Sequence, residues 1–561
     1  ATGDAEVNGT LNASAGGSQW FGSMTLQSGG TYEANIGNTT INNAPNGDYA
    51  FYGYSGSTLT HNDGTFVFSS GENSFVRTEG NGVFYNIIVD KSGYKLNTPH
   101  VGDLTVESNL TVTAGEIDRV TADKIINVTG DVDITGTIDL SGESGGAYFG
   151  SLTIQSGGTY DATSGTTTIT SENTGSGFAF NDLGTFTHNN GILNITTSAF
   201  TEFRGTAYDL IVSTGSFLVY RSITIADNNV TIDSGTLRSN NYGNDLTVTG
   251  DVLIRGGTLG LSIPESGDWS FGSLTINSGG TFEATNGTTT ITNESAGGYA
   301  INHDGTLNNN TGIFNITTVD ATLLDLTGTG NLNDLVMNTS SIASIVDTTT
   351  IDGNLNISSG TFQSNNDNRA LTITGDVIIN GGQLDSGSEA GARSFGSLTI
   401  NSGGTYDATS GTTTISGDFD NDGTFTHNDG ILEFSNFTGN DQRLGGGTFY
   451  DIVVSGSGSS WVELYAETSA TILNSLNHTS GEDLYLRNTF TFGNTTQAAT
   501  INMDGEGSGD RVSSSTSCKI YGASESYPVV ITGARDFMYW DNINFKWVDF
   551  QINTSTDDRS K

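Results

Sequence analysis

The sequence has little of several features on which common protein classes depend. Only one cysteine, Cys518, occurs in 561 residues, which excludes a disulfide framework or a cysteine-based metal site within one chain. There are only four prolines, which argues against a proline-rich linker. No run of 18 apolar residues exists, so no membrane-spanning helix is predicted. A protein with so few cysteines fits the expectation of a secreted microbial protein.

Positive charge is also scarce. The chain has 19 lysines and arginines against 61 aspartates and glutamates, which gives a formal net charge of −42. Such a chain repels nucleic acid and anionic membrane surfaces, so neither is expected as a partner. The acidity suits divalent cations or a salty medium, although it is equally consistent with a merely solvated acidic surface.

What the sequence does contain is glycine (77 residues) and short runs of alternating apolar and polar residues. Runs such as SLTI, TTTI and ILNITT are rich in β-branched residues and alternate with a period of two, which predicts β-strands. No segment of a dozen residues has helical periodicity. We therefore expect an all-β protein.

One phrase, FGSLTIQSGGTYDATSGTTTI, occurs four times with small changes, and its copies begin at Phe21, Phe149, Phe271 and Phe395. The spacings of 128, 122 and 124 residues indicate a repeat architecture. This pattern predicts a partial repeat, four units and a divergent C-terminal part, with boundaries at 1–20, 21–148, 149–270, 271–394, 395–500 and 501–561.

Two architectures are compatible with strand-like phrases about every 10 residues: an array of β-sandwiches and a parallel β-helix. Very short strands, glycine and asparagine at the corners, and the absence of linkers between units favour the β-helix. We expect a right-handed parallel β-helix with four super-repeats of about 124 residues and about 26 coils of about 20 residues each.

The quoted phrases, with Phe84–Val89 (FYNIIV) and Leu246–Ile254 (LTVTGDVLI), resemble those of right-handed parallel β-helix surface proteins. These include large secreted adhesins of microbes and repeat proteins of marine phages. The resemblance covers nearly the whole chain and implies an extracellular or cell-surface location. It transfers no active-site motif.

Residues Asp418 to Gly423 (DFDNDG) have the spacing of a calcium loop, in which alternating carboxylates converge on a hard cation. We therefore name Asp418, Asp420 and Asp422 as candidate calcium ligands, and calcium as the one candidate cofactor. An acidic corner between two strands is the alternative interpretation, because the twelfth loop position holds Asp429 instead of glutamate.

Histidines recur in related phrases at His61, His188 and His427, with His303 in a displaced variant. Copies about 124 residues apart are separated by several coils and cannot share one ion, so these residues are expected to lie on surface turns.

Enzymatic activity is not expected. Many β-helices cleave polysaccharides, and a glycosidase needs two carboxylates about 5–10 Å apart. Acidic residues are so common here that proximity alone has no meaning. A lyase acting on acidic sugars would need arginine or lysine, which the repeats nearly lack.

The C-terminal segment from Phe537 to Phe550 is unusually aromatic. It is expected either to form a wide final coil or to anchor a partner, since aromatic side chains dominate interface energetics. The candidate assembly residues are Phe537, Tyr539, Trp540, Phe545, Trp547 and Phe550.

The sequence thus predicts an extracellular structural protein that assembles head to tail with itself into a filament, sheath or surface layer. An adhesin or phage fibre stalk that binds surface glycans is the main alternative, and a polysaccharide-degrading enzyme is a weak one.

Overall fold

A computed structural model gives the fold of this chain. It describes residues 3–44, 48–79, 82–98, 103–119, 125–221, 224–239, 243–261, 266–364, 368–387, 389–436, 441–456, 461–479, 483–503, 512–513, 518–532 and 543–551. Structural statements below concern these residues.

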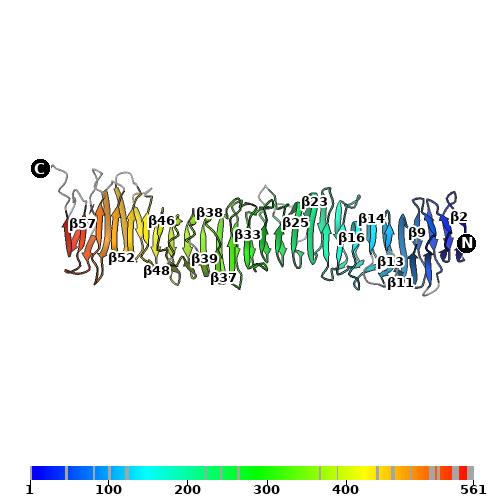
Figure 1. Cartoon of the computed structure of the whole chain (residues 1–561), viewed down its shortest axis with the longest axis horizontal. Coiled ribbons are helices and arrows are strands. Elements are labelled where there is room, and N and C mark those ends of the chain that lie inside the picture. The colour runs from blue at the N-terminus through cyan, green and yellow to red at the C-terminus, as the bar shows by residue number, and fades with distance from the viewer. Residues whose placement is uncertain are drawn as a thin grey trace. The chain divides into compact units, whose positions relative to one another are not determined.

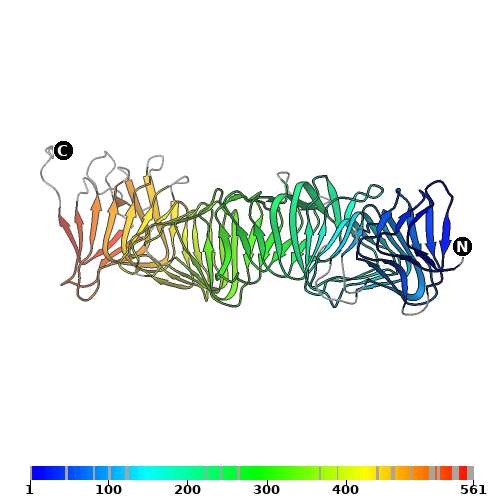
Figure 2. The ribbon, with the colours of Figure 1, turned by 45° about the vertical axis from the view of Figure 1, so that its right-hand side comes forward.

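The protein is all-β, as predicted, and forms a parallel β-solenoid of about 22 turns. The described residues contain no helix, and therefore none that is long and apolar enough to cross a membrane. The chain divides into two compact units, residues 1–271 with 275–283 and residues 272–274 with 284–561. Within each unit the strands of successive coils lie side by side (Figures 1 and 2).

The strands of the first unit form three parallel ladders. We call the first of these the platform ladder, and its strands pair in the order β1 (Ala5–Val7), β4 (Met24–Leu26), β7 (Tyr49–Gly53), β10 (Ser74–Thr78), β11 (Asn86–Thr98), β13 (Leu110–Arg119), β15 (Thr137–Asp139) and β17 (Thr159–Asp161). The second ladder contains β3 (Gln19–Phe21), β6 (Asn38–Ile41), β9 (Thr65–Phe68), parts of β11 and β13, β14 (Ile126–Ile134) and β16 (Ala147–Ile154).

The third ladder begins with a separate three-stranded sheet, β2 (Thr10–Asn12), β5 (Thr31–Glu33) and β8 (Thr58–Thr60). Further along, a ladder links β12 (Leu104–Val106), β14, β16, β18 (Thr166–Ile169), β21 (Ile192–Ile195), β23 (Asp209–Tyr220), β25 (Val230–Ser239) and β27 (Val252–Ile254).

The second unit repeats this arrangement. One ladder contains β35 (Ile313–Ile316), β37 (Asp334–Ile345), β39 (Leu355–Gln363), β41 (Val377–Ile379), β44 (Leu398–Ile400) and β47 (Phe419–Asn421). Another contains β40 (Leu371–Ile373), β43 (Arg393–Phe395), β46 (Thr412–Ile415), β49 (Ile431–Phe434), β51 (Gly447–Val454), β52 (Trp461–His478) and β54 (Thr500–Met503).

The alternation of each strand sends apolar side chains into the coil and polar ones outward. Along the second ladder, register partners form one buried column: Phe21, Ile41, Phe68, Val89, Val112, Ile134 and Ile154. Burial of each such side chain contributes about 1.5–3 kcal/mol. A single coil could not bury them alone, so stacking is what stabilises the fold.

The coils are longer than predicted. Successive partners in this column lie between 20 residues apart, as Phe21 and Ile41, and 27 residues apart, as Ile41 and Phe68. The expectation of about 26 coils is therefore wrong, because corner loops lengthen many coils beyond three short strands, and about 22 turns result.

The Gly-Gly pair in each phrase marks a tight turn, as predicted. The first glycine has a positive φ in all four copies, for example 88° at Gly157, a conformation that favours glycine. The second needs glycine for space, since a Cβ on Gly158 would lie 2.1 Å from the carbonyl oxygen of Ile134 on the neighbouring coil.

Candidate functional site

The predicted calcium ligands lie along a strand. Asp420 is within β47, and Asp418 and Asp422 directly flank it. The guanidinium of Arg443 lies 3.1 Å from an oxygen of Asp418 and 3.6 Å from one of Asp420, and it also contacts Glu467 at 3.2 Å. Burial raises the pKa of Asp420, and the charge of Arg443 opposes that shift. A cation at this place would compete with Arg443, and calcium binding here stays a prediction.

Three of the recurring histidines have similar local surroundings, each at a corner between two strands. The side chains of His61, His188 and His427 are 20%, 27% and 24% exposed. In each corner the asparagine that directly follows the histidine adopts a positive φ, and its side chain donates a hydrogen bond to a backbone carbonyl of the preceding coil. Asn189, for example, donates to the carbonyl of Ala162 at 2.8 Å. The histidine ring lies against a tyrosine of the next coil, with ring centroids 5.3 Å apart for His188 and Tyr208.

The fourth histidine corrects the expectation of a surface turn. His303 is fully buried at the end of β33 (Tyr299–His303). Its Nε2 lies 3.2 Å from the carbonyl oxygen of Thr329, and burial lowers the pKa of His303. The displacement of this histidine by several residues within its phrase places it in the strand instead of the corner.

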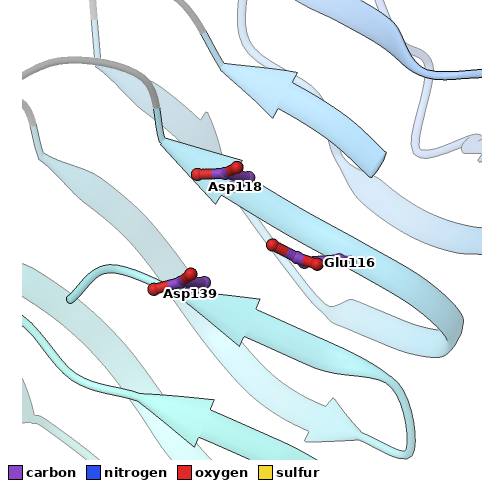
Figure 3. A group of neighbouring side chains, drawn as sticks. All are labelled: Glu116, Asp118 and Asp139. Carbon is purple, nitrogen blue, oxygen red and sulfur yellow. The ribbon is translucent and has the colours of Figure 1, made fainter. Parts of the chain in front are cut away.

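An acidic cluster of Glu116, Asp118 and Asp139 lies on the outer side of the platform ladder (Figure 3). Glu116 and Asp118 are two residues apart on β13 and therefore point to the same side, and Asp139 on β15 is the register partner of Asp118. One carboxylate oxygen from each residue lies within 4.8 Å of the others, a spacing that could hold a metal ion.

Lys95 already supplies a positive charge to the acidic cluster. Its Nζ donates to Glu116 Oε1 at 2.6 Å and to Asp118 Oδ2 at 2.8 Å. These two bonds raise the pKa of Lys95. Asp139 is instead held by Ser141, whose backbone N–H and hydroxyl donate to its carboxylate at 3.0 and 2.7 Å. Hard cations prefer such oxygen ligands, but here the ammonium bonds two of the three carboxylates.

Four part-exposed aromatic rings lie on the outside of the same ladder, on the coils of β7 and β10, which precede that of β11. We call Tyr49, Tyr52, Tyr54 and Phe75 the aromatic platform. Tyr49 and Tyr52 are stacked with centroids 4.6 Å apart, and Tyr54 lies 4.1 Å from Tyr52. Phe75 lies 5.8 Å from Tyr49, because β10 places it in register with that residue.

A polar network fixes these rings. Arg77 donates to the Tyr49 hydroxyl at 3.3 Å, lies over the ring of Tyr52 at 5.3 Å from the centroid, and forms an ion pair with Glu79. The Tyr52 hydroxyl donates to Glu79 at 2.8 Å. Burial and this bond to Glu79 raise the pKa of Tyr52 to about 12.

The platform and the acidic cluster belong to one outward row. Register partners run from Tyr49 to Phe75, Asn97, Asp118 and Asp139. The sequence reasoning missed both groups, since their members come from different coils. One local signal was available. The run Tyr49–Tyr54 (YAFYGY) has three tyrosines, whereas the corresponding run after the second phrase, Phe178–Asp182, is FAFND.

The predicted C-terminal assembly residues are only partly described. Phe537, Tyr539 and Trp540 lie outside the described residues, as does the side chain of Phe550. Phe545 is part-exposed in β58 (Ile543–Lys546), and Trp547 is 37% exposed, with the Lys546 ammonium 3.9 Å from its ring centroid. Their role in assembly stays a prediction.

Comparison with known proteins gives no relative for this chain. No protein-family model matches it, and neither the curated protein sequences nor the solved structures contain a significant match.

Proposed function

We propose that this protein is an extracellular structural protein whose copies assemble head to tail into a filament, sheath or surface layer. The observation that supports this proposal is the parallel stacking of coils. Every coil presents to the next a backbone edge and an inward column of matching side chains. A terminal coil of one chain could therefore continue the ladders of another by the same pairing, since an open strand edge is a template for addition.

The surface chemistry agrees with such a role. The net charge of −42 makes copies of the chain repel one another and opposes non-specific aggregation, so a specific contact such as strand pairing is needed for assembly. The cavities beside His188 and His427 are only about as large as a water molecule.

An adhesin or phage fibre stalk is the second candidate, and the aromatic platform is the observation that favours it.

Electron microscopy of the purified protein at moderate salt, with and without Ca²⁺, tests the proposal. Head-to-tail filaments are expected, and isolated particles or side-by-side trimers would contradict it. Deleting residues 537–561 should abolish assembly while the far-ultraviolet circular dichroism of the solenoid persists. Trp547→Ala removes an exposed candidate anchor, and Tyr148→Ala, at a residue 42% exposed elsewhere, is the matched control.

A further inference from the structure

The aromatic platform is not a requirement of the fold. Tyr52 is the register partner of Thr25 on the preceding coil, and the corresponding threonines of the second and fourth phrases, Thr153 and Thr399, pair with Asn181 and Asp420. Polar residues thus occupy the position of Tyr52 elsewhere with the same strand pairing; Asn181 is buried there, and Asp420 is part-exposed. Exposed aromatic rings that the fold does not need commonly mark a binding surface.

The rings are also organised before any ligand arrives. The bonds of Arg77 to Tyr49 and of Tyr52 to Glu79 hold the row of tyrosines in place. A surface ordered in this way loses little conformational entropy on binding, which raises affinity for a given contact area. Tyrosine suits a ligand that offers both apolar faces and hydroxyl groups, because the ring is apolar and its tip is polar.

The charges around the platform select the kind of ligand. Arg77 is paired with Glu79, and Lys95 is bonded to Glu116 and Asp118. Neither cation is therefore available to neutralise an acidic glycan, and the chain as a whole repels one. Carboxylates accept hydrogen bonds from hydroxyl groups, and they follow the rings along the same outward row. This surface is complementary to an uncharged sugar chain.

We propose that the aromatic platform binds a neutral polysaccharide that lies along the row of Tyr49, Tyr52 and Tyr54, against the ring edges that their mutual packing leaves free. The sugar chain also contacts Phe75, and its hydroxyls donate to neighbouring carboxylates. Three of the four rings lie along one coil, on β7 and the residue after it, and Phe75 lies on the next coil, so the sugar chain follows the strand direction. The inference does not rest on self-assembly: filaments can fail to form while the glycan still binds, and the reverse also holds.

Native affinity electrophoresis tests the inference with full-length protein in gels that contain hydroxyethyl cellulose, galactomannan or, as an acidic polysaccharide, alginate. The wild type should be retarded in at least one neutral gel and not in alginate. Tyr52→Asn should lower the association constant about tenfold or more, as expected for loss of an aromatic anchor. This variant carries the residue that the second phrase holds at the same place, Asn181, so folding should be preserved.

Tyr148→Ala is the control, since Tyr148 is an exposed tyrosine outside the platform, and its retardation should equal that of the wild type. The inference is overturned if the wild type is retarded in neither neutral gel, if Tyr52→Asn migrates like the wild type, or if retardation occurs only in alginate. A change of oligomeric state in Tyr52→Asn without any glycan effect would also overturn it and would make the platform a contact between copies.

Discussion

At the scale of single residues, one buried hydrogen bond recurs across phrases. The hydroxyls of Tyr32, Tyr160 and Tyr406 lie 3.0, 2.9 and 2.8 Å from those of threonines seven residues later. Burial raises the pKa of each tyrosine, and either hydroxyl of the pair can donate. The bond joins the GTY and TTT runs of one phrase across a coil corner.

Tyr160→Phe should therefore destabilise the protein. The substitution leaves the Thr167 hydroxyl without its buried partner, and the expected loss is about 1 kcal/mol in the free energy of unfolding. Chemical denaturation measures it. Tyr148→Phe removes a hydroxyl from an exposed ring and should have no effect. Equal stability of both variants and the wild type would contradict the importance of this bond.

Lys91 is a buried cation that composition could not reveal. It is 1% exposed, and its ammonium donates to the carbonyls of Ser70 and Glu72 and to the hydroxyls of Ser70 and Ser74. Burial lowers the pKa of Lys91 to about 8. In the unfolded chain the pKa of lysine is about 10.4, so above pH 8 the unfolded state holds more protons than the native state.

The free energy of unfolding should consequently rise between about pH 8 and pH 10, by an amount on the order of 2 kcal/mol. Below pH 8 both states are protonated, and this dependence disappears. Urea denaturation at pH 7, 8.5 and 10 measures the slope. Lys91→Met lacks the titrating group and should lose this part of the slope; parallel pH profiles for the two proteins would refute the assignment.

At the scale of strands, the coil register determines which residues meet. Corner side chains repeatedly accept a backbone N–H of the next coil: Asn86 accepts from Asn109 at 2.9 Å, and Asn109 accepts from Asp131 at 2.8 Å. Such bonds satisfy polar groups at corners, where strand pairing ends. They also explain why asparagine and aspartate are so frequent between the strands.

The acidic cluster depends on the same register, and Lys95 acts as its counter-ion. Lys95→Met should leave three neighbouring carboxylates without that charge and lower stability by about 0.5–1 kcal/mol, since the group is 40% exposed and screened by water. Millimolar Ca²⁺ should raise the melting temperature of Lys95→Met more than that of the wild type. Differential scanning calorimetry in CaCl₂ and in EDTA measures both.

Arg443→Met is the matched variant in the second unit, where Arg443 forms ion pairs with Asp418 and Asp420. If calcium binds Asp418 and Asp420 only when Arg443 is removed, Ca²⁺ should raise the melting temperature of Arg443→Met more than that of the wild type. Identical Ca²⁺-dependent shifts for Lys95→Met, Arg443→Met and the wild type would show that neither cation occupies a calcium-competent site.

At the scale of the whole chain, the sequence patterns predict the fold better than they predict the surface sites. The alternation of runs such as SLTI and the positive-φ glycine of each phrase are local, so they predict parallel coils directly. The aromatic platform joins β7 to β10, and the acidic cluster with Lys95 joins β11, β13 and β15. These residues lie about 20 positions apart, and corner loops of variable length decide whether they meet. Sequence spacing alone cannot supply that register.

The register also shows that one sequence repeat is not a whole number of turns. The buried column that begins at Phe21 of the first phrase reaches Ile154 of the second, not Phe149. Phe149 belongs to a separate column, which comes from Val106 and Val128 and runs on through Ile169, Ile195, Val212, Ile232 and Ile254. Successive phrases therefore start on different ladders, and equivalent surface residues of the first unit, such as His61 and His188, lie at different corners.

The predicted division into four units can be tested with this property. Deleting residues 149–270 joins Tyr148 to Phe271 and restores an unbroken phrase, so every coil keeps neighbours of the same kind. We expect this variant to keep its β-sheet circular dichroism and a cooperative thermal transition. Deleting residues 149–271 removes one residue more and shifts the register after the junction by one position. A one-residue slip exchanges inward and outward side chains, so this protein should melt at a lower temperature. A loss of 2 kcal/mol lowers the melting temperature by about 4–8 °C in a domain of 150–250 residues. If the two deletions prove equally stable, the 122-residue repeat has no structural meaning, and only the single coil counts as a unit of this solenoid.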